Sequence, residues 1–177
     1  MKKVLLSLCA GAMIASVTAL AAHATENSKA GTPAEVTFTV LRFRPVVVAN
    51  SDTQYTDAMM TLLAHPLVTV TGDSTNAVLH PHGAVDIEIR VQSIDPLESY
   101  TPVGIVFQQQ VVGNGPKTDC DGRNNFAQAH LNGSSLIVHD NFVQKGPDYR
   151  YEFFLVIQRG SDGKIGIIDP GIVNETD

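Results

Sequence analysis

Residues 149–168 read YRYEFFLVIQRGSDGKIGII, and this stretch decides the class of fold. Two runs rich in aromatic and β-branched side chains, at 150–158 and 164–168, are typical of strands. They flank RGSDG, whose two glycines and aspartate are residues that tight turns favour. The stretch therefore predicts an antiparallel β-hairpin.

The same strand signals recur upstream of this hairpin. In EVTFTVL (35–41) and VDIEIRVQ (85–92) the side chains alternate with a period of two, which indicates half-buried strands. The helix candidate is TDAMMTLLA (56–64), about two turns long and ended by His65-Pro66. Further strands are expected at 44–49, 67–71, 103–112 and 135–142. Many short strands separated by turn signals predict an all-β fold, a β-sandwich of short, mostly antiparallel strands with at most one short helix.

The N-terminal segment has the features of a secretory signal peptide. Two lysines precede an apolar stretch at 4–22, and Ala-His-Ala at 22–24 fits an A-x-A cleavage site. We therefore expect residues 1–24 to be removed and the protein to be periplasmic or secreted. Residues 25–34, TENSKAGTPA, are expected to form a flexible leader, followed by a single β-sandwich domain at 35–177.

Charge and cysteine content limit the partners. The whole chain has a formal net charge of −6, and loss of Lys2 and Lys3 with the signal peptide makes it −8. Nucleic acid and anionic membranes are therefore not expected as partners. Of the two cysteines, Cys9 lies in the signal peptide, so Cys120 would be the single cysteine of the mature chain. An intramolecular disulfide is then impossible.

The usual enzyme motifs are missing from the sequence. It contains no G-x-S-x-G elbow, H-E-x-x-H helix, phosphate loop or C-x-x-C pair. The loop DCDGRN (119–124) resembles a Ca²⁺ loop but lacks the closing glutamate, and a polar turn explains the same residues. His80-Pro81-His82 offers two imidazoles, with His65, His130 or His139 as a conceivable third ligand. An exposed loop explains that pattern better, so we expect neither a metal nor a cofactor.

The IDPG segment at 168–171 offers a different chemistry. The carboxyl group of Asp169 can reach its own main-chain carbonyl carbon and close a five-membered cyclic anhydride, which would release Pro170. Proline is a suitable leaving residue because its nitrogen is a tertiary amide without an N–H for strand pairing. Asp-Pro is also ordinary punctuation at the end of a strand, and Asp95-Pro96 repeats the pair elsewhere. On pattern alone, the structural interpretation is favoured.

The alternation of side chains along the last predicted strand suggests how the pKa of Asp169 could be raised. Ile165, Ile167 and Asp169 share one face of the last predicted strand, whereas Gly166 and Ile168 share the other. If the face of Ile165 and Ile167 is the core face, Asp169 lies at its rim. Desolvation would then raise the pKa of Asp169 and favour the protonated form that acid-type amide cleavage uses.

A cleavage that uses water needs a second carboxylate as general base. Asp140 is the leading candidate, because it continues an apolar face that carries Leu136 and Val138. Glu152 is a weaker candidate, because its face also carries large apolar side chains. His139 lies on the opposite face of its strand from Asp140 and is less favoured.

The stretch YRYEFFLVIQRGSDGKIGIIDPGIVNE (149–175), with EVTFTVLRF upstream, resembles the small bacterial DP-EP family, whose name refers to Asp-Pro endopeptidase activity. The resemblance covers residues 35–177. It implies a β-sandwich that acts as an aspartic-type peptidase on its own chain and cuts the Asp169-Pro170 bond. The substrate would be its own C-terminal segment, Pro170 to Asp177.

The family is also described as self-assembling, with capture of the freed aspartate by a lysine as an amide cross-link. A homo-oligomer and an Asp-Lys cross-link are therefore further implications of the resemblance. Lys145 is the candidate lysine; Lys164 lies on the same strand as Asp169 and too far along it for contact, at about 3.3 Å per residue. The alternative is a non-catalytic binding or assembly module that uses loops such as 72–84 or 113–125.

Overall fold

The structure is a computed structural model, and all of its regular secondary structure is β. No helix occurs in the ranges that it describes, which are 31–46, 55–73, 77–111, 122, 124–126, 128–143 and 149–173. The expected signal peptide and most of the expected leader lie outside these ranges. The strands, in chain order, are β1 (Ala34–Arg42), β2 (Asp57–Leu62), β3 (Val68–Thr71), β4 (Val78–Pro81), β5 (Val85–Ser93), β6 (Tyr100–Val111), β7 (Gln128–Asn132), β8 (Ser135–Asp140), β9 (Tyr149–Arg159), β10 (Ile165–Ile168) and β11 (Gly171–Val173).

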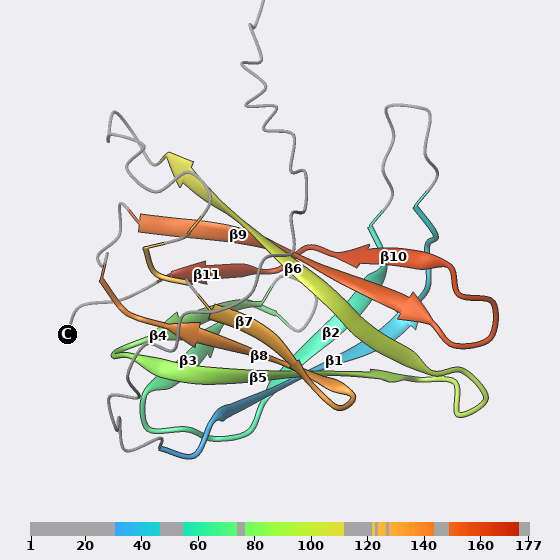
Figure 1. Cartoon of the computed structure of the whole chain (residues 1–177), viewed down its shortest axis with the longest axis horizontal. Coiled ribbons are helices and arrows are strands. Elements are labelled where there is room, and N and C mark those ends of the chain that lie inside the picture. Colours follow the sequence, from blue (N-terminus) through green and yellow to red (C-terminus); the bar gives the residue numbers. More distant parts are fainter. Residues whose placement is uncertain are drawn as a thin grey trace, which may run out of the picture.

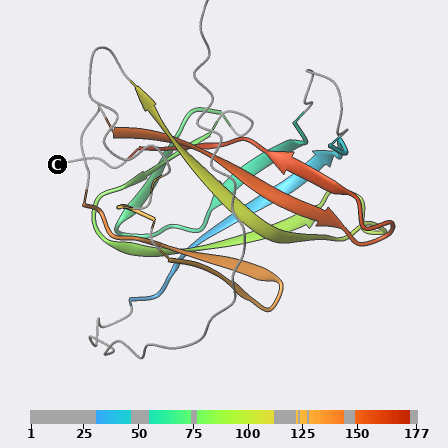
Figure 2. The ribbon, with the colours of Figure 1, turned by 45° about the horizontal axis from the view of Figure 1, so that its top comes forward.

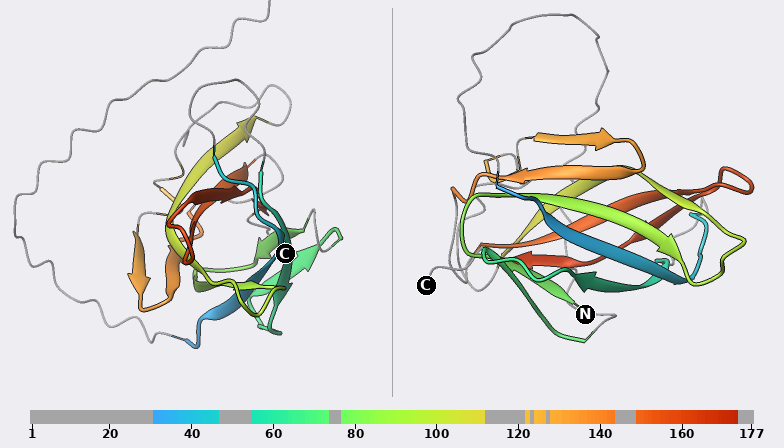
Figure 3. Two further views of the ribbon diagram at one scale, coloured as in Figure 1. Left: turned by 90° about the vertical axis from the view of Figure 1, so that its right-hand side faces the viewer. Right: turned by 90° about the horizontal axis from the view of Figure 1, so that it is seen from below.

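These strands form two sheets (Figure 1). The five-stranded sheet has the order β2-β1-β5-β8-β7, and the six-stranded sheet has the order β10-β9-β11-β4-β3 with β6 also paired to β9. The pairs β1-β5 and β11-β4 are parallel, and the other pairs between strands are antiparallel. Figure 2 shows the long β6 and β9 crossing above β5, and in Figure 3 the strands surround a common interior. The all-β prediction is confirmed.

The core lies between the two sheets because each sheet turns one apolar face inward. Phe38 of β1 meets Phe153 of β9 edge to face, with ring centroids 6.3 Å apart. Phe107 of β6 stacks on Phe126 at 3.9 Å, and Phe126 in turn packs edge-on against Tyr151. All of these side chains are at least nine-tenths buried. The contact of Phe38 with Phe153 therefore joins the two sheets, and Phe126 packs on the inner face of the six-stranded sheet.

The predicted helix at 56–64 is wrong, because residues 57–62 form β2. This strand pairs antiparallel with β1, with Met60 opposite Phe38 and Ala58 opposite Val40. Ala58 and Met60 are buried, whereas Asp57 is exposed, so the segment follows a period of two. Pairing with a buried neighbour has overridden the intrinsic helix propensity of alanine, methionine and leucine.

The predicted C-terminal hairpin is confirmed as β9, a turn and β10. Ile165 pairs with Gln158, and the N–H of Arg159 donates to the carbonyl of Lys164 at 2.9 Å. Gly163 has a φ of 70°, a conformation that glycine adopts without steric cost, and its N–H donates to the carbonyl of Arg159. The residues of RGSDG therefore form the tight turn that their types predict.

Candidate functional sites

The Asp169-Pro170 bond lies in the two-residue gap between β10 and β11. Ile168 pairs with Leu155 of β9, and Gly171 pairs with Glu152, so β10 and β11 keep one register along β9. The N–H of Phe153 donates to the carbonyl of Pro170 at 3.1 Å. An antiparallel pair of this kind normally exchanges two hydrogen bonds, but proline has no N–H for the second. The strand is therefore weakened at the Asp-Pro bond itself.

This segment is held on its other side as well. The N–H of Val46 donates to the carbonyl of Ile165 at 2.8 Å, and the N–H of Thr56 donates to that of Ile167 at 2.7 Å. Further along, Gly171 and Ile172 pair with β4. The Asp-Pro bond therefore lies between two segments that each have main-chain partners on both sides, at a break of the kind to which proline in sheets is normally confined.

The face of β10 that packs on the core is the opposite of the one considered from sequence. Gly166 and Ile168 are buried, whereas Ile165 and Asp169 are exposed. The reason is the ring of Phe43, which occupies the space where a side chain of residue 166 would stand: a Cβ there would lie 2.6 Å from it. Asp169 therefore lies on the outer face of the six-stranded sheet, and the hypothesis that it sits at the rim of the core face is wrong.

Asp169 is nevertheless partly shielded from water. The register places it opposite Phe154 of β9, and the rings of Phe154 and Tyr55 stack with centroids 6.0 Å apart. Burial raises the pKa of Asp169, and the neighbouring Glu152 carboxylate raises it further. Burial, Asp169 and Glu152 likewise raise the pKa of Tyr55. We call Tyr55, Glu152, Phe154 and Asp169 the acid patch.

Of the predicted acids, the structure brings Glu152 close to Asp169 and places Asp140 elsewhere. Asp140 ends β8 in the five-stranded sheet, is fully buried, and accepts a hydrogen bond from the N–H of Phe142 at 2.8 Å. Phe142 has a φ of 54°, which is uncommon for a residue with a side chain, and the Asp140 carboxyl stabilises that turn. Asp140 thus faces the core, whereas Asp169 faces outward from the other sheet. Lys145, the candidate for a cross-link, lies outside the described residues.

The histidines considered as metal ligands do not converge. His80 hydrogen-bonds with the hydroxyl of Thr71 at 2.6 Å, and His82 with that of Thr69 at 3.2 Å. In the part of the chain that the structure describes, no three His, Cys, Asp or Glu side chains are placed to hold a metal ion. Most of the loop at 119–124 lies outside that part. The described residues also include no helix long and apolar enough to cross a membrane.

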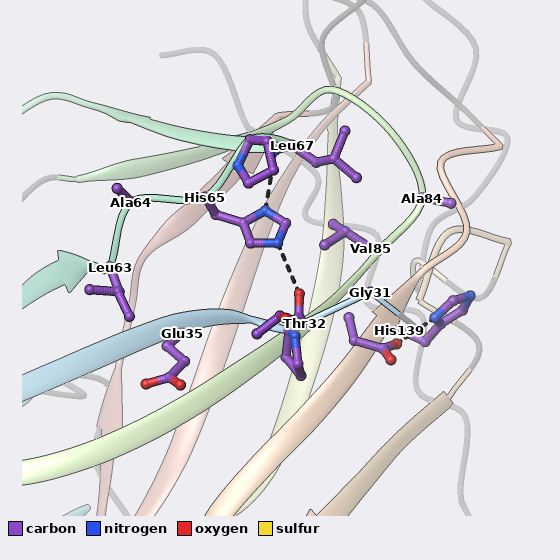
Figure 4. Close-up of a pocket in the computed structure, with 13 residues that line it drawn as sticks. Gly31, Thr32, Glu35, Leu63, Ala64, His65, Leu67, Ala84, Val85 and His139 are labelled. Carbon is purple, nitrogen blue, oxygen red and sulfur yellow. Dashed lines mark hydrogen bonds and ion pairs between the residues drawn. The ribbon is translucent and has the colours of Figure 1, made fainter. Parts of the chain in front are cut away.

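A second site is a pocket of about 590 Å³ beside the start of β1 (Figure 4). His65 stands in its wall, between the main chain of Thr32 and that of Leu67. On another side, Asp86 of β5 lies opposite His139 of β8, and Oδ1 of Asp86 is 2.6 Å from Nδ1 of His139. The sequence offered both histidines only as metal ligands or as a base, and the pocket itself was not predicted.

The fold and these two sites define an all-β, two-sheet domain with an internal Asp-Pro bond and a small pocket. No family model matches the chain, and no curated protein matches it. Among solved structures, it is similar to an inclusion body protein (PixA) from Burkholderia cenocepacia J2315, with 10% sequence identity and a TM-score of 0.45. The match covers 82% of this chain and 96% of that one. A likeness of this degree transfers neither family nor function.

Proposed function

We propose that this protein is a self-processing domain that cleaves its own Asp169-Pro170 bond by an aspartic-type mechanism. The observation that carries the proposal is the position of the Asp169 carboxyl, whose pKa burial and Glu152 raise, at a proline that lacks the second strand hydrogen bond. The resemblance of the C-terminal stretch to the DP-EP family supports the same proposal. Cleavage would take place in the periplasm or outside the cell.

The chemistry follows from the side chain of Asp169. In its protonated form, a carboxyl oxygen attacks the main-chain carbonyl carbon of the same residue, and the carboxyl proton passes to the nitrogen of Pro170. The C–N bond breaks, which leaves a cyclic anhydride at residue 169 and a free secondary amine at residue 170. Water then opens the anhydride. A raised pKa favours the first step because more of the carboxyl retains its proton at mild pH.

Glu152 is the second acid of the proposed mechanism, in the role that the sequence assigned first to Asp140. Glu152 stands on the same outer face and acts electrostatically on Asp169. We assign it the exchange of a proton with the Asp169 carboxyl or with the water that opens the anhydride. Asp140 faces the core of the domain and holds the turn at Phe142. Glu152→Gln is expected to slow cleavage more than Asp140→Asn, once both variants are shown to be folded.

The released segment would stay in place after the cut. Ile172 is only 1% exposed, and β11 pairs with β9 on one side and β4 on the other. Burial of an isoleucine side chain stabilises such an association by about 1.5–3 kcal/mol, before the strand hydrogen bonds are considered. Because β11 also has main-chain partners on both sides, the two pieces can stay together on a native gel or a gel-filtration column, so the test must be made under denaturing conditions.

The decisive experiment is the intact mass of the freshly purified mature chain under denaturing but non-acidic conditions, with Asp169→Ala as the control. The proposal expects a fragment that ends at Asp169, absent from the control. Asp95-Pro96 is a matched bond within the same chain: it lies in an exposed turn, where the Asp95 carboxylate accepts the N–H of Leu97 at 2.9 Å. Cleavage at both bonds at once would indicate ordinary acid hydrolysis instead.

Two other outcomes have separate meanings. A single uncut mass that persists through days of incubation contradicts the proposed function. A loss of one water with every residue retained indicates an amide cross-link between the side chain of Asp169 and a lysine, formed without the cut. In the second case, the position of the linked lysine distinguishes Lys145 from Lys164.

A second candidate function is a non-catalytic binding module, and the pocket beside the start of β1 favours it. Its volume of about 590 Å³ lies within the range of small-ligand sites, roughly 300–1,000 Å³. An uncut chain that binds a small molecule would support this candidate over self-processing.

A further inference from the structure

One wall of the pocket in Figure 4 is held by His65, whose ring hydrogen-bonds to two segments of the chain. The main-chain N–H of Leu67 donates to its Nδ1 at 3.2 Å, so that nitrogen carries no proton. Its Nε2 lies 2.9 Å from the carbonyl of Thr32, which can only accept, so the proton is on Nε2. The neutral ring therefore ties the connection between β2 and β3 to the residues just before β1.

Apolar side chains form much of the pocket lining. Leu63 is 66% exposed and Leu67 is 39% exposed, which are large fractions for leucine. Pro33, Pro66 and Val85 add further apolar surface to the same lining. Apolar walls around a cavity of this volume suit the hydrocarbon body of a small organic molecule.

The polar side of the pocket is the pair of Asp86 and His139. The two side chains stand directly opposite each other on β5 and β8 and are 32% and 35% exposed, so both can be reached from solvent. Because a carboxylate only accepts hydrogen bonds, Nδ1 of His139 carries the proton between them. In a neutral His139 ring, Nε2 is then an acceptor. The hydrogen bond uses one carboxylate oxygen of Asp86.

The charged side chains that line the pocket are all acidic. The lining includes two carboxylates, Glu35 and Asp86, and neither lysine nor arginine. Glu35 forms an ion pair with Arg90, whose Nη1 lies 3.2 Å from Oε2, although Arg90 also pairs with Glu88. Among the residues that the structure describes, the side-chain partner of Asp86 is His139. The pocket therefore presents an apolar wall next to acceptor groups, which include the Asp86 carboxylate.

We propose that this pocket binds a small primary amine with an apolar body. The ammonium group donates hydrogen bonds to the Asp86 carboxylate, and the hydrocarbon part packs on Leu63, Leu67 and Val85. This site lies on a different part of the fold from the acid patch, because Asp86 and His139 belong to the five-stranded sheet. The proposal therefore stands whether or not the Asp169-Pro170 bond is cut.

The test is an NMR titration of the mature chain with three probes of similar shape: 2-phenylethylamine, 2-phenylethanol and 3-phenylpropionate. The proposal expects the amine to shift the backbone amide signals of Asp86, His139 and Leu67 at millimolar or lower concentration, and the carboxylate to shift none of them. Asp86→Asn should weaken amine binding at least about tenfold, because it removes a hydrogen bond to a charged group from the binding free energy. Leu63→Ser, at an exposed position of the wall, should weaken binding of all probes that bind.

Matched controls separate loss of the site from loss of the fold. The spectra of Asp86→Asn and Leu63→Ser must retain the dispersed signals of the core strands, and an Asp169→Ala chain should bind the amine as the unsubstituted chain does. Equal binding of the amine and the carboxylate would overturn the assignment of an ammonium site. Absence of any shift near the pocket with all three probes would overturn the pocket as a small-molecule site.

Discussion

Replacement of Ile172 of β11 by alanine is expected to destabilise the domain strongly. The side chain is 1% exposed and lies between Tyr151 of β9 and Leu79 of β4 in the register. The substitution removes three carbon atoms, worth about 0.8 kcal/mol each when buried, and leaves a cavity that adds to this loss. The total expected cost is about 3–4 kcal/mol in the free energy of unfolding.

The measurement is urea unfolding, followed by far-UV circular dichroism, in an Asp169→Ala background so that every molecule has the same covalent structure. A domain of this size loses roughly 2–4 °C in Tm per kcal/mol, so thermal unfolding should shift down by about 6–16 °C. The matched control is Ile94→Ala, because Ile94 is 63% exposed and should cost less than about 0.5 kcal/mol. If both variants cost the same, β11 is not part of the core, and a released segment would not be retained.

Three other predictions concern the acid patch and one turn. Asp169→Asn should stabilise the domain at neutral pH relative to wild-type chain that intact mass shows to be uncut. The pKa of Asp169 in the folded state is raised above the usual 3.8, so wild-type stability falls as pH rises through the folded pKa, and the advantage of the variant should vanish in acid. Equal stability of both chains across a pH series of thermal melts contradicts this. Glu152→Gln should lower the pKa of Asp169 and shift the pH profile of self-cleavage, measured by intact mass, to lower pH; an unchanged profile would exclude Glu152 from the reaction. Gly122→Ala should cost about 2–4 kcal/mol in urea unfolding, because φ is 69° and the new Cβ would lie 2.7 Å from Cβ of Phe107; a cost below about 1 kcal/mol would show that this turn can relax.

The strands that were predicted from sequence share a strong local signal. The alternation in EVTFTVL and VDIEIRVQ, and the turn residues in RGSDG, correspond to β1, β5 and the hairpin of β9 and β10. Segment 56–64 was misassigned because alanine, methionine and leucine favour a helix locally, although Ala58 and Met60 also alternate with outward residues. The short strands β4, β7 and β11 were missed because their pairing partners are distant in sequence, and such contacts leave no local pattern.

The acid patch was only partly predictable. Parity correctly grouped Ile165, Ile167 and Asp169 on one face, but both faces of that strand are apolar, so parity could not say which one packs inward. That choice depends on Phe43 filling the space above Gly166. Tyr55 lies at the patch because the N–H of the next residue, Thr56, donates to the carbonyl of Ile167. No local sequence pattern predicts this hydrogen bond. The pairing of Asp86 with His139 likewise depends on the register of two strands far apart in sequence.

The place of β11 in the six-stranded sheet has a consequence for how the domain opens. Among the described residues, the β3-β4 hairpin pairs with the rest of its sheet through β11 alone, because β4 pairs with β3 and β11. Loss of β11 would leave the inner edge of β4 without main-chain partners, and its amide protons would exchange with solvent more rapidly. Hydrogen exchange of the β4 amide protons that face β11 therefore reports, without any label on the C-terminal segment, whether that segment still occupies the sheet.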